Sequence, residues 1–291
     1  MSAVLSLRRP RAAALALALL APLGCHSLKL GPLPAEKPAK VEKDPALAAP
    51  GKFSMRVSQY VFLSDFELKK DLPLFQDLTE LREQVYKELQ LPAATSVVQV
   101  FLFEDRERYE RFMHAKYPDL PRRRAFFVAQ PRAGGEDLYV YTYWGDRVRE
   151  DLRHELTHAL LHSVLKDVPL WLDEGLAEYF ELPPELKGVN PHHLEQLRQA
   201  DFKPNLARLE ALGQVQQMTP VEYRESWAWV YLMLHDRPEA KTVLLAYLAQ
   251  LRTNPAPGPL QPRLAQVLPD PEGALEKQLA RLDPVVPTAQ R

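Results

Sequence analysis

The motif that most constrains this chain is His154-Glu155-Leu156-Thr157-His158, which lies in a segment with helical character. Residues four apart in a helix share one face, with their Cβ atoms about 5–6 Å apart. Two imidazoles placed in this way can bind one metal ion, and the glutamate between them can act on a water bound to that metal. The motif therefore predicts a helix that carries a metal site, and the residues that follow must supply the other ligands.

Glu174 is the candidate for a third ligand. If the helix continues from His158 to about Leu165, the chain climbs roughly 10 Å at about 1.5 Å per residue. Residues 166–169 are predicted to form a turn, with Pro169 opening a second helix. An antiparallel helix that descends roughly 8 Å at the same rise returns Glu174 to the level of His158.

The same hairpin places Glu178 one turn beyond Glu174, near the level of His154. Two histidines and a carboxylate, with one coordination position left open, form the ligand set of a catalytic zinc site. A second carboxylate beside a ligating histidine commonly orients that histidine. Glu178 fits this role, although it could also be a surface carboxylate or replace Glu174 as the ligand.

The segments at 154–158 and 171–179, His-Glu-Leu-Thr-His and Trp-Leu-Asp-Glu-Gly-Leu-Ala-Glu-Tyr, resemble the gluzincin metallopeptidases, the thermolysin- and aminopeptidase-type clan. The likeness is greatest to the small bacterial peptidase MA-like domains of this clan. One difference is the spacing, because Glu174 follows His158 by only sixteen residues, fewer than in the best-known members. The connection between the two helices must therefore be tight.

The resemblance implies a role for each residue of the motif. Zn²⁺, one ion per chain, would be bound by His154, His158 and Glu174. Glu155 would be the general base, and Glu178 would support a histidine. The G-x-M-E-N motif of gluzincin aminopeptidases does not occur in this sequence, so we expect an endopeptidase acting on peptides or proteins.

A hydrogen-bond donor for the developing oxyanion is expected downstream, where many gluzincins have a tyrosine or histidine. Tyr223 and Tyr231 are the candidates, with Tyr223 slightly favoured. The alternative for either tyrosine is packing in the core of an amphipathic helix.

The beginning of the chain resembles a signal peptide over residues 1–24. An arginine-rich segment at 8–11 precedes an apolar run at 12–20, which contains only Ala and Leu and is too short for a stable membrane span. Cys25 follows in a Leu-Gly-Cys context that resembles a bacterial lipoprotein signal, which would be cleaved before Cys25 and lipidated on it. An ordinary signal peptide with an incidental cysteine is the alternative.

The remainder divides into three segments by composition. Residues 26–51 are rich in Pro, Ala and Lys and predict a flexible tether. Residues 52–252 are the predicted metallopeptidase domain, and 253–291 a Pro-rich link, a terminal helix at about 271–282 and a loose tail. The formal net charge of −1 gives no strong field toward nucleic acid. We therefore expect an exported protein, lipid-anchored to a bacterial membrane on its periplasmic or cell-surface side.

The fold is predicted to be α+β, with an N-terminal mixed-sheet lobe that carries the metal helix and a mainly helical C-terminal lobe. Strands are expected at 53–64, 96–103, 125–128 and 137–144, helices at 74–89 and 105–113, and only helices beyond Asp146. Alternation in the last strand predicts Leu138, Val140 and Thr142 on one face and three tyrosines on the other.

The strand at 137–144 directly precedes the metal helix. Because gluzincins pair extended substrate with the strand nearest that helix, we expect 137–144 to be an edge strand that binds substrate by β-augmentation. A plain sheet strand is the alternative.

Other interpretations of the same residues stay open. A catalytically silent gluzincin-fold lipoprotein could act as a binding or scaffolding module, although its motif would more typically be broken. A structural zinc site usually has four protein ligands, and no cysteine or matched histidine supplies a fourth here. Asp173 is expected to be only a helix-start acid, and His162 and the pair His192-His193 to be packing, outer-sphere or surface residues. Close approach to the metal helix would explain Gly175.

Overall fold

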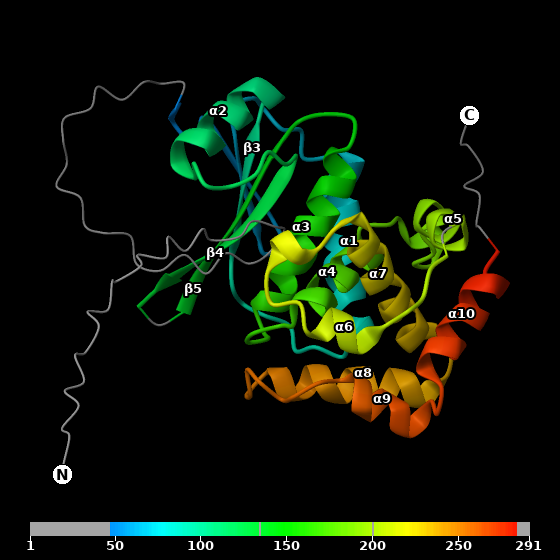
Figure 1. Ribbon diagram of the computed structural model, residues 1–291. Helices are drawn as coiled ribbons and strands as arrows, with labels where there is room; N and C mark the ends of the chain where they lie inside the picture. The colour runs from blue at the N-terminus through cyan, green and yellow to red at the C-terminus, as the bar shows by residue number, and fades with distance from the viewer. Residues whose placement is uncertain (1–46, 134, 200, 284–291) are drawn as a thin grey trace, which may run out of the picture.

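The computed structural model describes residues 47–133, 135–199 and 201–283. The predicted signal peptide, Cys25, nearly all of the tether and the tail from 284 onward lie outside these residues. The described chain is α+β, as predicted: a five-stranded mixed sheet in the N-terminal half is followed by a mostly helical region (Figure 1).

The first two strands form a hairpin rather than the single strand predicted at 53–64. β1 (Phe53–Val57) pairs antiparallel with β2 (Tyr60–Ser64). Ser58, with φ of 53°, adopts the left-handed conformation that lets the chain reverse between them. The sequence concealed this turn because neither Ser58 nor Gln59 is a Gly, Asn or Asp that would mark it.

The strand order is β1-β2-β3-β5-β4. β3 (Val98–Phe103) lies at the centre, as predicted, and is parallel to both β2 and β5 (Gly135–Tyr143). β4 (Ala125–Arg132) pairs antiparallel with β5 and forms one edge of the described sheet. The prediction that 137–144 is the edge strand is therefore wrong. β5 uses both of its sides for pairing, and β4 takes the edge beside the metal helix.

The two faces of the sheet bury different side chains, as the alternation in β5 predicted. Leu138 and Val140 join a cluster with α1 (Pro73–Glu88) and the helices that follow the sheet. Tyr141 and Tyr143 pack on the opposite face against α2 (Arg106–Lys116). Figure 1 shows α2 on one side of the sheet and α1 on the other.

Every described element after β5 is helical. α3 (Val148–His162) and α4 (Leu170–Phe180) form the predicted hairpin, and α7 (Pro220–His235) packs on α4. The other elements are η2 (Pro184–Leu186), α5 (Pro191–Gln199), α6 (Leu206–Glu210), η3 (Val215–Gln217), α8 (Pro238–Leu251), α9 (Gln261–Val267) and α10 (Pro271–Arg281). α10 matches the predicted terminal helix, and α9 is an additional short helix that begins at the end of the Pro-rich link.

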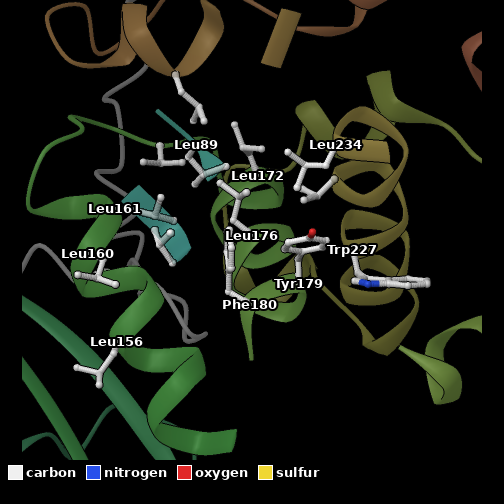
Figure 2. Packing of buried hydrophobic residues seen from close by; sticks show 14 of the residues in the cluster. Leu89, Leu156, Leu160, Leu161, Leu172, Leu176, Tyr179, Phe180, Trp227 and Leu234 are labelled. Atoms are coloured by element: carbon white, nitrogen blue, oxygen red, sulfur yellow. The ribbon is translucent and has the colours of Figure 1, made fainter. Parts of the chain in front are cut away.

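One buried cluster unites the inner face of the sheet with the helices. Figure 2 shows its middle layer, in which α4 lies between α3 and α7; the labelled side chains include Leu156, Leu160 and Leu161 of α3, Leu172, Leu176 and Phe180 of α4, and Trp227 and Leu234 of α7. Because this core is continuous, the relative position of α3 and α4 is fixed by packing from both sides. No helix among the described residues has the length and apolar character needed to cross a membrane.

Candidate metal centre

α3 buries the whole histidine motif. His158 has no exposed surface, Glu155 is 3% exposed and His154 is 9% exposed. The helix packs on β4 and β5 with one side and on α4 with the other, so the polar residues of the motif also face protein. Glu150 and Asp151 in its first turn favour the helix N-terminus electrostatically.

The hairpin brings Glu174 to both histidines. α3 ends at His162, and α4 begins at Leu170 with Pro169 as its N-cap. The Oε2 atom of the fully buried Glu174 lies 3.5 Å from Nε2 of His154 and 3.6 Å from Nε2 of His158. One ligand atom from each of the three residues lies within 4.8 Å of the others, so the group could hold a metal ion. The sixteen-residue spacing is therefore compatible with convergence of the three side chains.

Gly175 allows this convergence, although through a different contact from the one expected. A Cβ atom at Gly175 would lie 2.6 Å from the carbonyl oxygen of Ser226 and 2.9 Å from a methyl group of Val230. Both residues belong to α7, not to the metal helix. The glycine lets α4 pack closely against α7 while the preceding residue, Glu174, reaches the histidines of α3.

Asp173 has a larger role than the helix-start acid that was predicted. Its Oδ1 lies 3.0 Å from Nδ1 of His158, and its Oδ2 lies 3.0 Å from Nε2 of His162. The side chain is 1% exposed. Asp173 therefore fixes the ring of His158 through the nitrogen that does not face Glu174. Its position directly before Glu174, and the four-residue step from His158 to His162, were the available sequence signals.

Burial and charge act in opposite directions on these groups. Burial lowers the pKa of His158, but the charges of Asp173 and Glu174 and their hydrogen bonds outweigh it and raise that pKa well above its usual value. Burial raises the pKa of Glu174, but hydrogen bonds from His154 and His158 outweigh it and lower the pKa. The same carboxylates that favour a protonated His158 also favour a bound cation at this position.

The partner of His154 at its second nitrogen is Glu181, which the sequence did not indicate. Nδ1 of His154 lies 3.0 Å from Oε2 of Glu181, the C-cap residue of α4. Glu178, the predicted supporting carboxylate, lies 2.8 Å from Nε2 of His193 in α5. Ligand atoms of His154, Glu178 and Glu181 also lie within 4.8 Å of one another. His193 is thus a partner of this region rather than an isolated surface residue.

A cleft of about 260 Å³ opens at His154 and Glu155. Its walls come from α3, from the end of α4 and from the segment that enters β4, and they include Arg123, Arg124, Ala125, His154, Glu155 and Glu181. The Nε atom of Arg124 donates to both carboxylate oxygens of Asp151, at 3.0 and 3.2 Å. This ion pair ties the β4 side of the cleft to the metal helix.

The two tyrosine candidates lie in different surroundings. The hydroxyl oxygen of Tyr223 accepts a hydrogen bond from Nη2 of Arg123 at 3.1 Å, and Arg123 lines the cleft. Tyr231 is buried, with its ring stacked on that of His235 at a centroid distance of 4.4 Å and tilted against that of Trp227. The geometry therefore brings Tyr223 next to the cleft and places Tyr231 in the core.

No known protein-family model matches this chain, and no curated protein matches it.

Proposed function

We propose that the protein is a zinc-dependent peptidase in which His154, His158 and Glu174 bind one Zn²⁺. The observation that carries this proposal is the separation of the ligand atoms. Zinc binds histidine nitrogen at about 2.0–2.1 Å and carboxylate oxygen at about 2.0–2.2 Å, so two ligands of a tetrahedral ion lie about 3.3–3.5 Å apart. The separations of 3.5 and 3.6 Å from Glu174 to the two imidazoles are close to this value.

The donor set favours zinc over the common hard cations. Calcium and magnesium prefer ligand shells of oxygen atoms, whereas imidazole nitrogen suits zinc and its transition-metal neighbours. Three protein ligands with a fourth position for water are typical of catalytic rather than structural zinc. A bound zinc ion supplies a water of lowered pKa and a positive charge that polarises the substrate carbonyl.

Glu155 is the proposed general base. It lies on α3 between the two histidines and lines the cleft. Its carboxylate would accept the proton of the attacking water and deliver it to the leaving amine.

Tyr223 is the proposed donor to the oxyanion. The guanidinium of Arg123 donates to its hydroxyl oxygen, so the proton of the hydroxyl group is what Tyr223 would offer to a substrate oxygen. A nearby cation also makes the phenol a stronger donor. Donors of this kind, aimed at the position where negative charge develops, commonly contribute a large part of catalysis.

Substrate binding is proposed along β4, because it is the edge strand on the metal side of the described sheet. An extended peptide that added to this edge by backbone hydrogen bonds would reach the cleft where β4 begins, at Ala125. The binding mode places no requirement on a free chain end, which favours an endopeptidase. Export and a lipid anchor on Cys25 stay predictions from the sequence.

The test is cleavage of casein peptides by the purified protein, its Glu155→Gln variant and a Glu195→Gln control on the exposed side of α5. Glu155→Gln should keep one zinc per chain and lose about 10²–10⁴-fold in kcat, the usual contribution of a general base. The control should behave as the wild type does. Zinc binding without cleavage of a broad peptide library would contradict the peptidase proposal and favour a silent binding module.

A further inference from the structure

The end of α4 presents two glutamates to the metal centre, and their partners differ. Oε2 of Glu181 lies 3.0 Å from Nδ1 of His154. Oε2 of Glu178 lies 2.8 Å from Nε2 of His193, whose ring packs edge-on against Trp227. One carboxylate thus contacts a proposed metal ligand, and the other contacts a histidine of α5.

The two nitrogens of His154 face opposite partners. Nε2 lies 3.5 Å from Oε2 of Glu174, on the side where the three ligands converge. Nδ1 faces Glu181. A neutral imidazole that binds a metal through one nitrogen carries its proton on the other. A metal on Nε2 would therefore leave an Nδ1–H group that donates directly to Glu181.

We infer that Glu181 is the positioning residue that orients His154 for metal binding, whereas Glu178 anchors His193 and α5. The inference rests on the proposed metal centre but not on peptidase activity. It assigns the role to the residue seven positions after Glu174 rather than four after it.

Arg153 explains how Glu181 is held in place. Its guanidinium has no exposed surface. Nε donates to the carbonyl oxygens of Phe180 and Glu181, at 3.1 and 3.2 Å, and Nη2 donates to that of Leu182 at 2.9 Å. Arg153 precedes His154 in α3, so one helix supplies both the ligand and the group that fixes the backbone of its partner.

A second cation held by His154, Glu178 and Glu181 is the competing explanation, since these three also lie close together. That site would need Nδ1 of His154 as a ligand while Nε2 binds the first ion. The imidazole would then have to lose its last proton, which neutral histidine holds strongly. A single ion, with Glu181 as the acceptor of the Nδ1 proton, needs no such step.

The test is zinc affinity, measured by competition with a chromophoric chelator, for the wild type, Glu181→Ala, Glu181→Gln and Glu178→Ala. Removing a carboxylate that supports a metal-bound histidine typically weakens metal affinity by about 10–100-fold, and we expect this for Glu181→Ala. Glu181→Gln keeps an acceptor oxygen and should lose less zinc affinity than Glu181→Ala. Glu178→Ala should stay close to the wild type. Thermal unfolding of the zinc-free forms separates loss of affinity from loss of fold.

Two results would overturn the inference. An affinity loss in Glu178→Ala equal to or larger than that in Glu181→Ala would assign the role to Glu178. Two zinc ions per wild-type chain, with one lost in Glu181→Ala, would show a second metal site instead. Peptide cleavage does not enter these measurements, so a failure of the peptidase proposal leaves the affinities interpretable. A wild-type protein that binds no zinc would overturn both this inference and the proposed function.

Discussion

Two buried charge clusters lie side by side on α3, and they are built in opposite ways. Around Arg153, the cations Arg149 and Arg153 share the carboxylate of Asp77, at 2.6 and 3.1 Å, and backbone carbonyls accept the remaining bonds of Arg153. Asp77 thus supplies a counter-charge for the buried Arg153, while the side chain of Arg149 reaches solvent.

Around His154 and His158 the balance differs. Three carboxylates contact these two histidines: Asp173, Glu174 and Glu181. No arginine or lysine is paired with them in the described structure, and Glu178 adds a further carboxylate beside them through its contact with His193. Such a cluster is balanced by added positive charge, either protons or a metal ion. The first cluster is therefore suited to stabilising the fold, whereas His154, His158 and Glu174 of the second could hold a cation.

The largest expected effect falls on the Arg153 cluster. Asp77→Ala leaves a fully buried guanidinium without its carboxylate, and breaking a buried ion pair in this way costs about 3–5 kcal/mol. Urea denaturation should show this loss in the free energy of unfolding. Asp71→Ala, in the exposed segment before α1, is the matched control. An unfolding free energy equal to that of the wild type would mean that the cluster does not stabilise the fold.

The next effect concerns catalysis. Tyr223→Phe should lower kcat by about 10²–10³-fold, equivalent to about 2.7–4 kcal/mol, the usual effect of removing one oxyanion donor. Tyr231→Phe should leave kcat near the wild-type value because that ring lies in the core. Zinc content should be unchanged in both variants. The reverse ranking of the two tyrosines would contradict the proposed site.

Zinc should stabilise the protein through the second cluster only. At about 100 times its dissociation constant, a ligand that binds only the folded state adds about 2.7 kcal/mol to the unfolding free energy. Differential scanning calorimetry with and without zinc should show this gain in the wild type and not in Glu174→Ala. A gain of equal size in Glu174→Ala would place the ion elsewhere.

A smaller effect is expected at the contact between α4 and α7. Gly175→Ala introduces a Cβ atom against the carbonyl of Ser226, which cannot rotate away. Overpacking of this kind typically costs about 1–3 kcal/mol, and part of it is offset by the better helix propensity of alanine, about 1 kcal/mol. Chemical denaturation should show net destabilisation. Gly213→Ala, where a Cβ atom would meet nothing within 4 Å, is the control.

The pH dependence of the unfolding free energy should reveal the contribution of the Arg153 cluster. Burial raises the pKa of Asp77, but hydrogen bonds and charges from Arg149 and Arg153 outweigh it and lower the pKa in the folded protein. The stabilisation is therefore complete above the unfolded-state pKa of about 4. It is lost as the pH falls through the lower pKa of the folded state. Asp77→Asn should remove this acid-dependent part of the unfolding free energy. If the unfolding free energy of that variant fell at low pH as it does in the wild type, the acid dependence would belong to other carboxylates.

Local patterns in the sequence predicted the framework of the site. The helical spacing of His154 and His158 and the short step to Glu174 depend on helix geometry alone, and the hairpin followed from it. The same holds for the alternation in β5. These features are local, so neighbouring residues determine them.

The features of the site that were not predicted from the sequence depend on tertiary contacts. Glu181 reaches His154 because Arg153 fixes the end of α4, and His193 reaches Glu178 from a helix that begins at Pro191. The edge position of β4 depends on the pairing of β5 with β3. No local pattern encodes these pairings, because each joins segments whose approach depends on the packed core.

The most direct test of the central claim is anomalous scattering at the zinc edge from crystals grown with zinc. The account predicts one peak at the triad, about 2.0–2.2 Å from a nitrogen of His154, a nitrogen of His158 and a carboxylate oxygen of Glu174. No peak at these residues, or a peak held instead by Glu178 and Glu181, would contradict it.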